Sequence, residues 1–391
     1  MFSRIKFDIS AMVTDIYSKI PQEMFESDVT TFVDIQAAGL QFIIPLIEIL
    51  RKKGHSDDNI RNRVYAYAEN DLYLNYVMFK YKGLPITYKI YDEKINMKFD
   101  VVIGNPPYNK QVGPKKTQPV WPKFVEKSFD MCKEDGYVSL IHPNGWRNFD
   151  GKFKDIQKLL LSKCVKYINM NSPSDGVEVF KAQIAFDYYL IQNKSHENEL
   201  VDIVDYDDKL HNIDIRNFDF IPNSNIDLVY SLVAKEGEET VKILHSYSDY
   251  ETRKNYMSKV RTEEHIYPCV YTVKTNDTLT YFYSNKNDNG HFGVPKVIWG
   301  NGASYGVIID ENGEYGLTQF SYAIVDEPNN LPLIKKVLQS KCFIQNIMGY
   351  YGGTTLIIFN RKIISTFRKD FWKEFLDENN NVIEPKLTDV K

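Results

Sequence analysis

The chain has 391 residues and a mass of 45.6 kDa, and its 43% apolar and 26% charged residues exclude a disordered or fibrous protein. Its 48 Lys and Arg against 52 Asp and Glu give a net charge of −4, so no overall basic excess marks a nucleic-acid binder. Four widely spaced cysteines without a Cys-x-x-Cys pair argue against a zinc site or a disulfide framework. We expect reduced thiols, no metal, no membrane association, a cytoplasmic location and, at this length, two domains.

Short β-rich runs alternate with helical stretches in the first half of the chain. Strands are predicted where β-branched and apolar residues cluster, and helices where apolar residues recur at spacings of three and four. The predicted strands are 30–34, 63–68, 86–91, 99–104, 136–142, 164–170 and 184–192, and the predicted helices are 10–20, 41–53, 72–82 and 121–133. The compact apolar run 99–104 is typical of a strand buried on both faces of a parallel sheet. The alternation predicts an α/β fold with a doubly wound sheet.

The composition changes near Asn193. Residues 195–251 contain 14 acids and 4 bases, whereas residues 110–166 contain 12 bases and 6 acids. Charge runs are commonly solvated faces, but this segregation also fits a molecule with one basic cleft. Beyond the change, short strands are predicted at 295–299 and 305–310. We therefore predict a first domain over 1–193 and a second over 194–391.

The segment most informative about chemistry is Gly104-Asn-Pro-Pro-Tyr108, which directly follows the buried run 99–104. Pro106 and Pro107 fix their own φ angles, so the turn is held stiffly where the strand ends. Asn105 offers a side-chain acceptor, Pro106 a backbone carbonyl and Tyr108 a flat aromatic face. Two acceptors that bind the hydrogens of a delocalised amine favour a pyramidal nitrogen and stabilise the charge that grows there during alkyl transfer. An Asn-Pro pair alone is typical of an ordinary turn, but this longer pattern after a buried strand indicates a site for a planar amine.

At these residues the chain resembles the amino-directed S-adenosylmethionine-dependent methyltransferases, especially the adenine-N6 DNA methyltransferases of restriction-modification systems. The segment 104–108 is similar to their motif IV, and 31–42 is similar to their cofactor-binding motif I. Segment 135–146 resembles the strand after motif V, and helix 10–20 resembles motif X. The similarity runs in order from Phe7 to Gln192. It implies a Rossmann-like methyltransferase sheet that transfers a methyl group to N6 of an adenine flipped out of DNA.

The resemblance also assigns roles to individual residues. The catalytic residues it implies are Asn105, Pro106, Pro107 and Tyr108. Segment 179–186 resembles the motif whose aromatic residue holds the flipped base, so Tyr108 and Phe180 are expected to stack on that base. The expected contacts to S-adenosylmethionine are Ser10, Asp34, Ala38, Gly39, Glu69, Asp92 and Asn105.

The chain departs from the family in motif I, where glycines normally stand at the positions of Ala38 and Leu40. Glycines let the backbone approach the cofactor closely, so Leu40 is expected to narrow the pocket or to replace a contact. This departure leaves a plain strand-helix turn as an alternative interpretation of the segment.

The second half resembles, more loosely, the target-recognition domains of type IIG and Taq-like enzymes, through segments 294–299 and 338–341. A mixed α+β recognition domain would make double-stranded DNA the partner, with a cognate restriction endonuclease as a second one. Two alternatives stay open. A protein N5-glutamine methyltransferase shares the Asn-Pro-Pro-Tyr motif but lacks a large C-terminal domain, and a non-catalytic DNA-binding subunit would explain the altered motif I. No nuclease motif stands out in the chain, so we expect no endonuclease activity.

Overall fold

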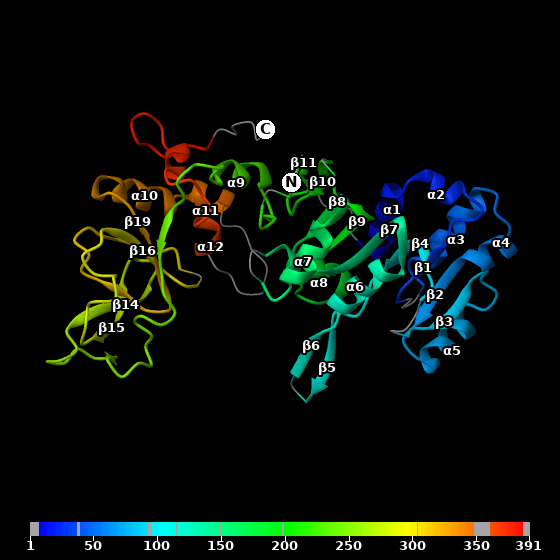
Figure 1. The fold of residues 1–391 in the computed structure, drawn as a ribbon, viewed down its shortest axis with the longest axis horizontal. Coiled ribbons are helices and arrows are strands. Elements are labelled where there is room, and N and C mark those ends of the chain that lie inside the picture. Colours follow the sequence, from blue (N-terminus) through cyan, green and yellow to red (C-terminus); the bar gives the residue numbers. More distant parts are fainter. Residues whose placement is uncertain are drawn as a thin grey trace. The chain divides into compact units, whose positions relative to one another are not determined.

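The computed structural model describes residues 8–36, 40–92, 96–114, 116–148, 151–197, 199–216, 218–302, 304–347 and 360–385. It divides into two compact units, 1–221 and 222–391 (Figure 1). Within the described residues, no helix combines the length and apolarity needed to cross a bilayer. The four cysteines are free and buried.

A nine-stranded sheet forms the centre of the first unit, in the order β11-β10-β8-β9-β7-β4-β1-β2-β3. The strands are β1 (Phe32–Asp34), β2 (Val64–Ala68), β3 (Thr87–Ile90), β4 (Phe99–Gly104), β7 (Cys132–Pro143), β8 (Lys163–Asn171), β9 (Phe186–Ser195), β10 (Val201–Val204) and β11 (Leu210–Ile213). The adjoining strands β3, β2, β1, β4 and β7 are parallel, whereas β9 runs antiparallel to both β7 and β8. The predicted α/β class is confirmed, with a mixed sheet in place of a purely parallel one.

Helices connect these strands as the alternation predicts. They are α1 (Ile9–Lys19), α2 (Gln22–Glu26), α3 (Ile43–Lys52), α4 (Asp57–Arg63), α5 (Asp71–Lys80), α6 (Trp121–Met131), α7 (Lys154–Leu161) and α8 (Pro173–Phe180). A short 3₁₀ turn, η1 (Asn144–Arg147), follows β7, and a separate two-stranded hairpin, β5 (Asn109–Gly113) and β6 (Lys116–Pro119), follows β4. Apolar residues of α1, α3 and the strands form one buried cluster beside the sheet. Strand β4 is almost wholly buried, as its composition predicts.

The first unit extends further than the predicted boundary between 193 and 194. Strand β9 runs through that point to Ser195, and β10 then pairs in parallel with β8. Val201 and Ile203 are fully buried in β10, so the sheet needs this segment to cover its edge. The change in charge near Asn193 therefore marks a surface of the first unit, and the division between the units lies at 221/222.

The second unit is a mixed α+β structure with two four-stranded sheets, β12-β19-β16-β17 and β13-β15-β14-β18. Its strands are β12 (Lys242–Leu244), β13 (Met257–Ser258), β14 (Tyr267–Val273), β15 (Leu279–Ser284), β16 (Lys296–Gly300), β17 (Val307–Asp310), β18 (Gly316–Leu317) and β19 (Ser321–Val325). Its helices are α9 (Ile226–Leu232), α10 (Leu331–Leu338), α11 (Lys341–Ile347) and α12 (Arg361–Ile364), with 3₁₀ turns η2 (Pro328–Asn330) and η3 (Phe371–Phe375).

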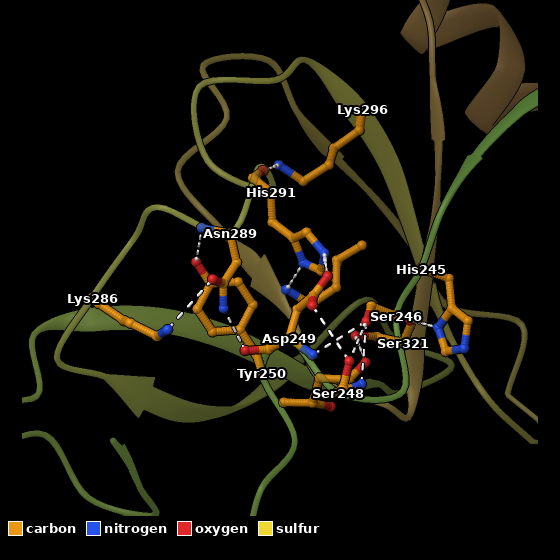
Figure 2. Close-up of polar contacts among 12 residues, drawn as sticks. His245, Ser246, Ser248, Asp249, Tyr250, Lys286, Asn289, His291, Lys296 and Ser321 are labelled. Atoms are coloured by element: carbon orange, nitrogen blue, oxygen red, sulfur yellow. Dashed lines mark hydrogen bonds and ion pairs between the residues drawn. The ribbon is translucent and has the colours of Figure 1, made fainter. Parts of the chain in front are cut away.

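A buried lysine organises one loop of this unit. Lys296 is fully buried, forms a 2.6 Å ion pair with Asp310, and donates hydrogen bonds to the carbonyls of His291 and Val294. Figure 2 shows the Lys296 ammonium reaching the backbone of His291, while Asn289 in the same loop contacts Asp249 and Tyr250. Lys296 lies in the segment 294–299, which we expect to resemble recognition domains, and its buried ammonium stabilises the loop.

Candidate active site

Four strands of the first unit end at the same edge of the sheet. Because β3, β2, β1 and β4 are adjacent and parallel, the residues that follow them gather at one edge. Asp34 ends β1 and lies opposite Ile103, Glu69 follows β2, Asp92 lies shortly after β3, and Asn105 follows β4. The structure therefore places four of the predicted site residues at the edge where ligands bind in open α/β sheets.

Asp34 lies against the start of the Asn-Pro-Pro-Tyr motif. A Cβ atom built on Gly104 would lie 3.2 Å from Asp34 Oδ1 and 2.9 Å from Ile35 Cγ2. Position 104 must therefore stay a glycine for the motif to approach β1 so closely. The Ile35 N–H also donates to the Ile103 carbonyl at 3.0 Å, which fixes the two strand ends together.

The Asp34 carboxyl is buried without a compensating charge. Its side chain is 1% exposed, and its Oδ1 accepts a 3.1 Å hydrogen bond from the Gln36 N–H. Burial raises the pKa of Asp34 from 3.8 to about 7, and the Gln36 hydrogen bond lowers it only in part. In the described part of the chain no cation pairs with this carboxyl. A ligand that brings hydrogen-bond donors or positive charge to it would relieve the cost of burial, which fits the amine and sulfonium of S-adenosylmethionine.

Helix α1 supports the loop that follows β1. The Tyr17 hydroxyl donates to the Phe42 carbonyl at 2.6 Å, and burial and the nearby Asp34 charge raise the pKa of Tyr17. Asp15 Oδ2 accepts hydrogen bonds from the hydroxyls of Tyr167 at 2.7 Å and Tyr188 at 2.8 Å, which joins the helix to β8 and β9. Sequence reasoning missed the role of Tyr17, although its place on the apolar stripe of the helix indicates that it faces the core.

The structure brings together the two aromatic residues that were predicted to hold the base. The rings of Tyr108 and Phe180 lie 5.8 Å apart at an interplanar angle of 81°, and Phe180 packs in turn on Phe186 at 4.9 Å. Phe180 is the last residue of α8, and Phe186 begins β9. Residues more than 70 positions apart in the sequence therefore meet beside the motif.

The Tyr108 hydroxyl is buried and makes no hydrogen bond to any described residue. Burial raises its pKa well above the ordinary value, so the hydroxyl stays neutral. An unpaired buried hydroxyl costs free energy that a bound partner would recover. Any chemical role of Tyr108 therefore depends on its ring or on a hydrogen bond to a ligand, and not on its ionisation.

The altered residue in the cofactor loop has a structural function. Leu40 has a φ of +55°, a conformation that favours glycine, yet its side chain is fully buried in the apolar cluster of the first unit. The Leu40 side chain packs into the core, and its expected effect on the cofactor pocket stays a prediction. Ala38 and Gly39, also predicted to contact the cofactor, lie outside the described residues.

The remaining predicted cofactor residues are on the surface. Glu69 and Asp92 are exposed at the edge of the sheet, so they can bind a ligand only where it reaches the surface. Ser10 is exposed in the first turn of α1, and its carbonyl accepts from the Thr14 hydroxyl at 2.9 Å. The roles of these three residues stay predictions.

The sequence between α3 and α8 matches a known family. Residues 46–175 match the Eco57I restriction-modification methylase family. This match covers a third of the chain, includes the Asn105–Tyr108 motif, and confirms the predicted similarity to restriction-modification methylases. No curated protein matches the chain.

Several solved structures share parts of this architecture at low identity. The type IIG restriction endonuclease BpuSI is 11% identical over 93% of this chain and 58% of its own, with a TM-score of 0.49. The M protein of the type I restriction enzyme EcoKI is 13% identical over 52% of this chain and 49% of its own, with a TM-score of 0.40. A modification subunit of a type I restriction enzyme from Vibrio vulnificus YJ016 is 13% identical over 50% and 46%, with a TM-score of 0.41. The chain spans about half the length of the two type I subunits, and these similarities assign it no substrate.

Proposed function

We propose that the chain is a DNA methyltransferase of the restriction-modification type, which transfers a methyl group from S-adenosylmethionine to the N6 amine of adenine. The observation that carries this proposal is the Asn105–Tyr108 motif at the carboxyl end of the buried strand β4, with Tyr108 packed on Phe180 and Asp34 against Gly104. The family match over 46–175 supports the methylase class. The adenine substrate and the flipped state of the base rest on the chemistry of the motif.

In this proposal the chain activates the amine by hydrogen bonding. The Asn105 side-chain carbonyl and the Pro106 backbone carbonyl accept the two amine hydrogens, which localises the lone pair on nitrogen and stabilises its growing positive charge. S-adenosylmethionine supplies the electrophilic methyl group when bound. The nitrogen lone pair would accept this methyl group while Asn105 and Pro106 hold the amine, and the surplus proton would leave to water. No described residue at the motif is needed as a strong base.

Tyr108 and Phe180 would hold the base outside the helix. Their rings pack at an interplanar angle of 81°, so they would form an apolar wall beside Asn105. Asp34, Glu69 and Asp92 would hold the cofactor at the neighbouring strand ends. The second unit, residues 222–391, would select the DNA sequence, with a cognate restriction endonuclease acting on the same sequence.

The role of Asn105 can be tested by single-turnover methylation of duplex DNA with methyl-labelled cofactor. Asn105→Ala is expected to lose about 100-fold or more in rate, since it removes an acceptor matched to charge that develops in the transition state. Asn62→Ala, at an exposed position before β2, is the matched control and should keep the wild-type rate. A wild-type rate in Asn105→Ala would contradict the proposed role, and labelling of a protein substrate in place of DNA would favour the glutamine methyltransferase.

A further inference from the structure

A two-stranded hairpin projects from the first unit directly after the motif. Strands β5 (Asn109–Gly113) and β6 (Lys116–Pro119) pair only with each other, apart from the main sheet. Figure 1 shows the hairpin extending away from the body of its unit. The five residues of β5 and the four of β6 give it a reach of roughly 13 to 16 Å.

The described residues of the hairpin form no hydrophobic core of their own. Its side chains are exposed along both strands, with only Gly113 and Pro119 partly covered, and Val112 near the tip is 49% exposed. Isolated two-stranded hairpins are at best marginally stable in water. A protruding ribbon without a core is therefore best explained by a partner that it contacts.

The strand register places two lysines on the same face of the ribbon. Lys110 lies opposite Gln118, and Lys116 is two residues before Gln118, so both lysines share one face. Gln111 lies opposite Thr117 on the other face, next to Asn109. One face thus carries both lysines together with Gln118, and the other carries two amides and a hydroxyl, groups that hydrogen-bond to base edges.

The charge of the hairpin is entirely of one sign. Residues 109–119 contain three lysines and no acid, in a chain whose net charge is −4. Lys110 and Lys116 are exposed, and neither forms an ion pair within the described parts of the chain. Free lysines on a projecting ribbon complement the phosphates of a nucleic acid.

The base of the hairpin is hydrogen-bonded to the proposed catalytic motif. The Val120 N–H donates to the Tyr108 carbonyl at 3.0 Å, which closes the base of the ribbon on the residue that ends the motif. A base held at Tyr108 would therefore bring its flanking duplex within reach of β5 and β6. The major groove, about 12 Å wide, accepts a two-stranded ribbon.

We propose that the β5–β6 hairpin enters a groove of double-stranded DNA beside the target base, with Lys110 and Lys116 on phosphates and Gln111 and Thr117 toward the base edges. This inference rests on the proposed function, because it takes the duplex to be the substrate held at Asn105. It places part of the DNA contact in the first unit, in addition to any recognition by residues 222–391.

The test measures DNA affinity of the full chain across a salt series for wild type, for the double variant Lys110→Gln/Lys116→Gln, and for the control Lys52→Gln/Lys158→Gln. The control lysines are exposed on α3 and α7, and the change in net charge is the same. Removing two phosphate contacts should reduce the slope of log K against log salt by about 2 and weaken binding roughly tenfold per contact at 0.1 M salt. The control should keep the wild-type slope within 0.5.

The outcomes separate this inference from the proposed function. If wild type methylates DNA but the hairpin variant keeps the wild-type affinity and slope, the hairpin inference is wrong and the proposed function stands. If wild type neither binds nor methylates DNA, the proposed function itself fails. Loss of binding to duplex RNA without loss of binding to duplex DNA would assign the hairpin to RNA and would also overturn the inference.

Discussion

In the proposed cofactor site, the burial of the Asp34 carboxylate costs electrostatic free energy that can be measured. Its carboxyl is buried, accepts one backbone hydrogen bond, and has a pKa raised to about 7. The folded state therefore binds a proton that the unfolded state releases above pH 4. The stability linked to that proton is fully present below pH 4 and is lost as pH rises through 7.

We expect Asp34→Asn to stabilise the ligand-free protein at high pH. The substitution removes the buried charge but keeps an oxygen that can accept from the Gln36 N–H. The difference from wild type should be near zero at pH 4 and reach at most about 4 kcal/mol above pH 8. Urea unfolding at both pH values measures it, with the exposed Asp130→Asn as control. A stability difference that does not change with pH would show that Asp34 carries no raised pKa.

Leu40 combines an unfavourable backbone conformation with a well-packed side chain. Leu40→Gly and Leu40→Ala both remove the buried side chain, a loss of about 2 to 5 kcal/mol for a leucine, but only glycine relieves the positive φ. The glycine variant should therefore be the more stable of the two by about 1 kcal/mol, opposite to the usual preference for alanine. Thermal unfolding of both variants decides this. A more stable alanine variant would place Leu40 outside the left-handed region.

At the scale of elements, the sequence predicted most of the first sheet. Periodicity and β-branched clusters located β1, β2, β3, β4, β7, β8 and β9 within a few residues. The antiparallel direction of β9 was not predicted, because a burial pattern does not encode strand direction. The hairpin β5–β6 was missed since its polar strands lack the apolar alternation that indicates a half-buried strand.

The sequence predicted those residues of the candidate site that lie at the ends of strands. Asp34 ends β1, and Asn105 directly follows β4. Because these two strands are parallel neighbours, the topology alone brings the two residues close together. The burial of Leu40 depends on the packing of α1 and α3, which a single motif does not reveal. The contact of Tyr108 with Phe180 was anticipated only through the family resemblance, since no local pattern joins residues that far apart.

Helix α8, which ends at Phe180, packs closely against the chain before β9 at Gly176. A Cβ atom on Gly176 would lie 2.0 Å from the Ile184 carbonyl oxygen, a backbone atom that cannot move without shifting the chain before β9. Gly176→Ala, which usually stabilises a helix interior, should here lower the thermal stability. Glu178→Ala, exposed on the same helix, is the control and should change little. Unchanged stability of Gly176→Ala would mean that α8 does not pack this tightly.

At the scale of the whole molecule, the overall composition hides where acidic and basic residues lie. The acid-rich stretch that begins near residue 195 first completes the sheet of the first unit through β10 and β11, and the second unit begins only at Pro222. Net charge and pI describe the average of the two units, whereas the free lysines of the β5–β6 hairpin are local. Binding to DNA therefore does not require a basic chain.

The most direct test of the proposed activity is nucleoside analysis of duplex DNA after incubation with the full chain and methyl-labelled S-adenosylmethionine. The proposal predicts label in N6-methyladenine at a fixed sequence context, and loss of that label in Asn105→Ala. Label in a different nucleoside would contradict the adenine substrate. Label in protein, or cofactor binding without any transfer, would contradict the proposal that this chain is a DNA methyltransferase.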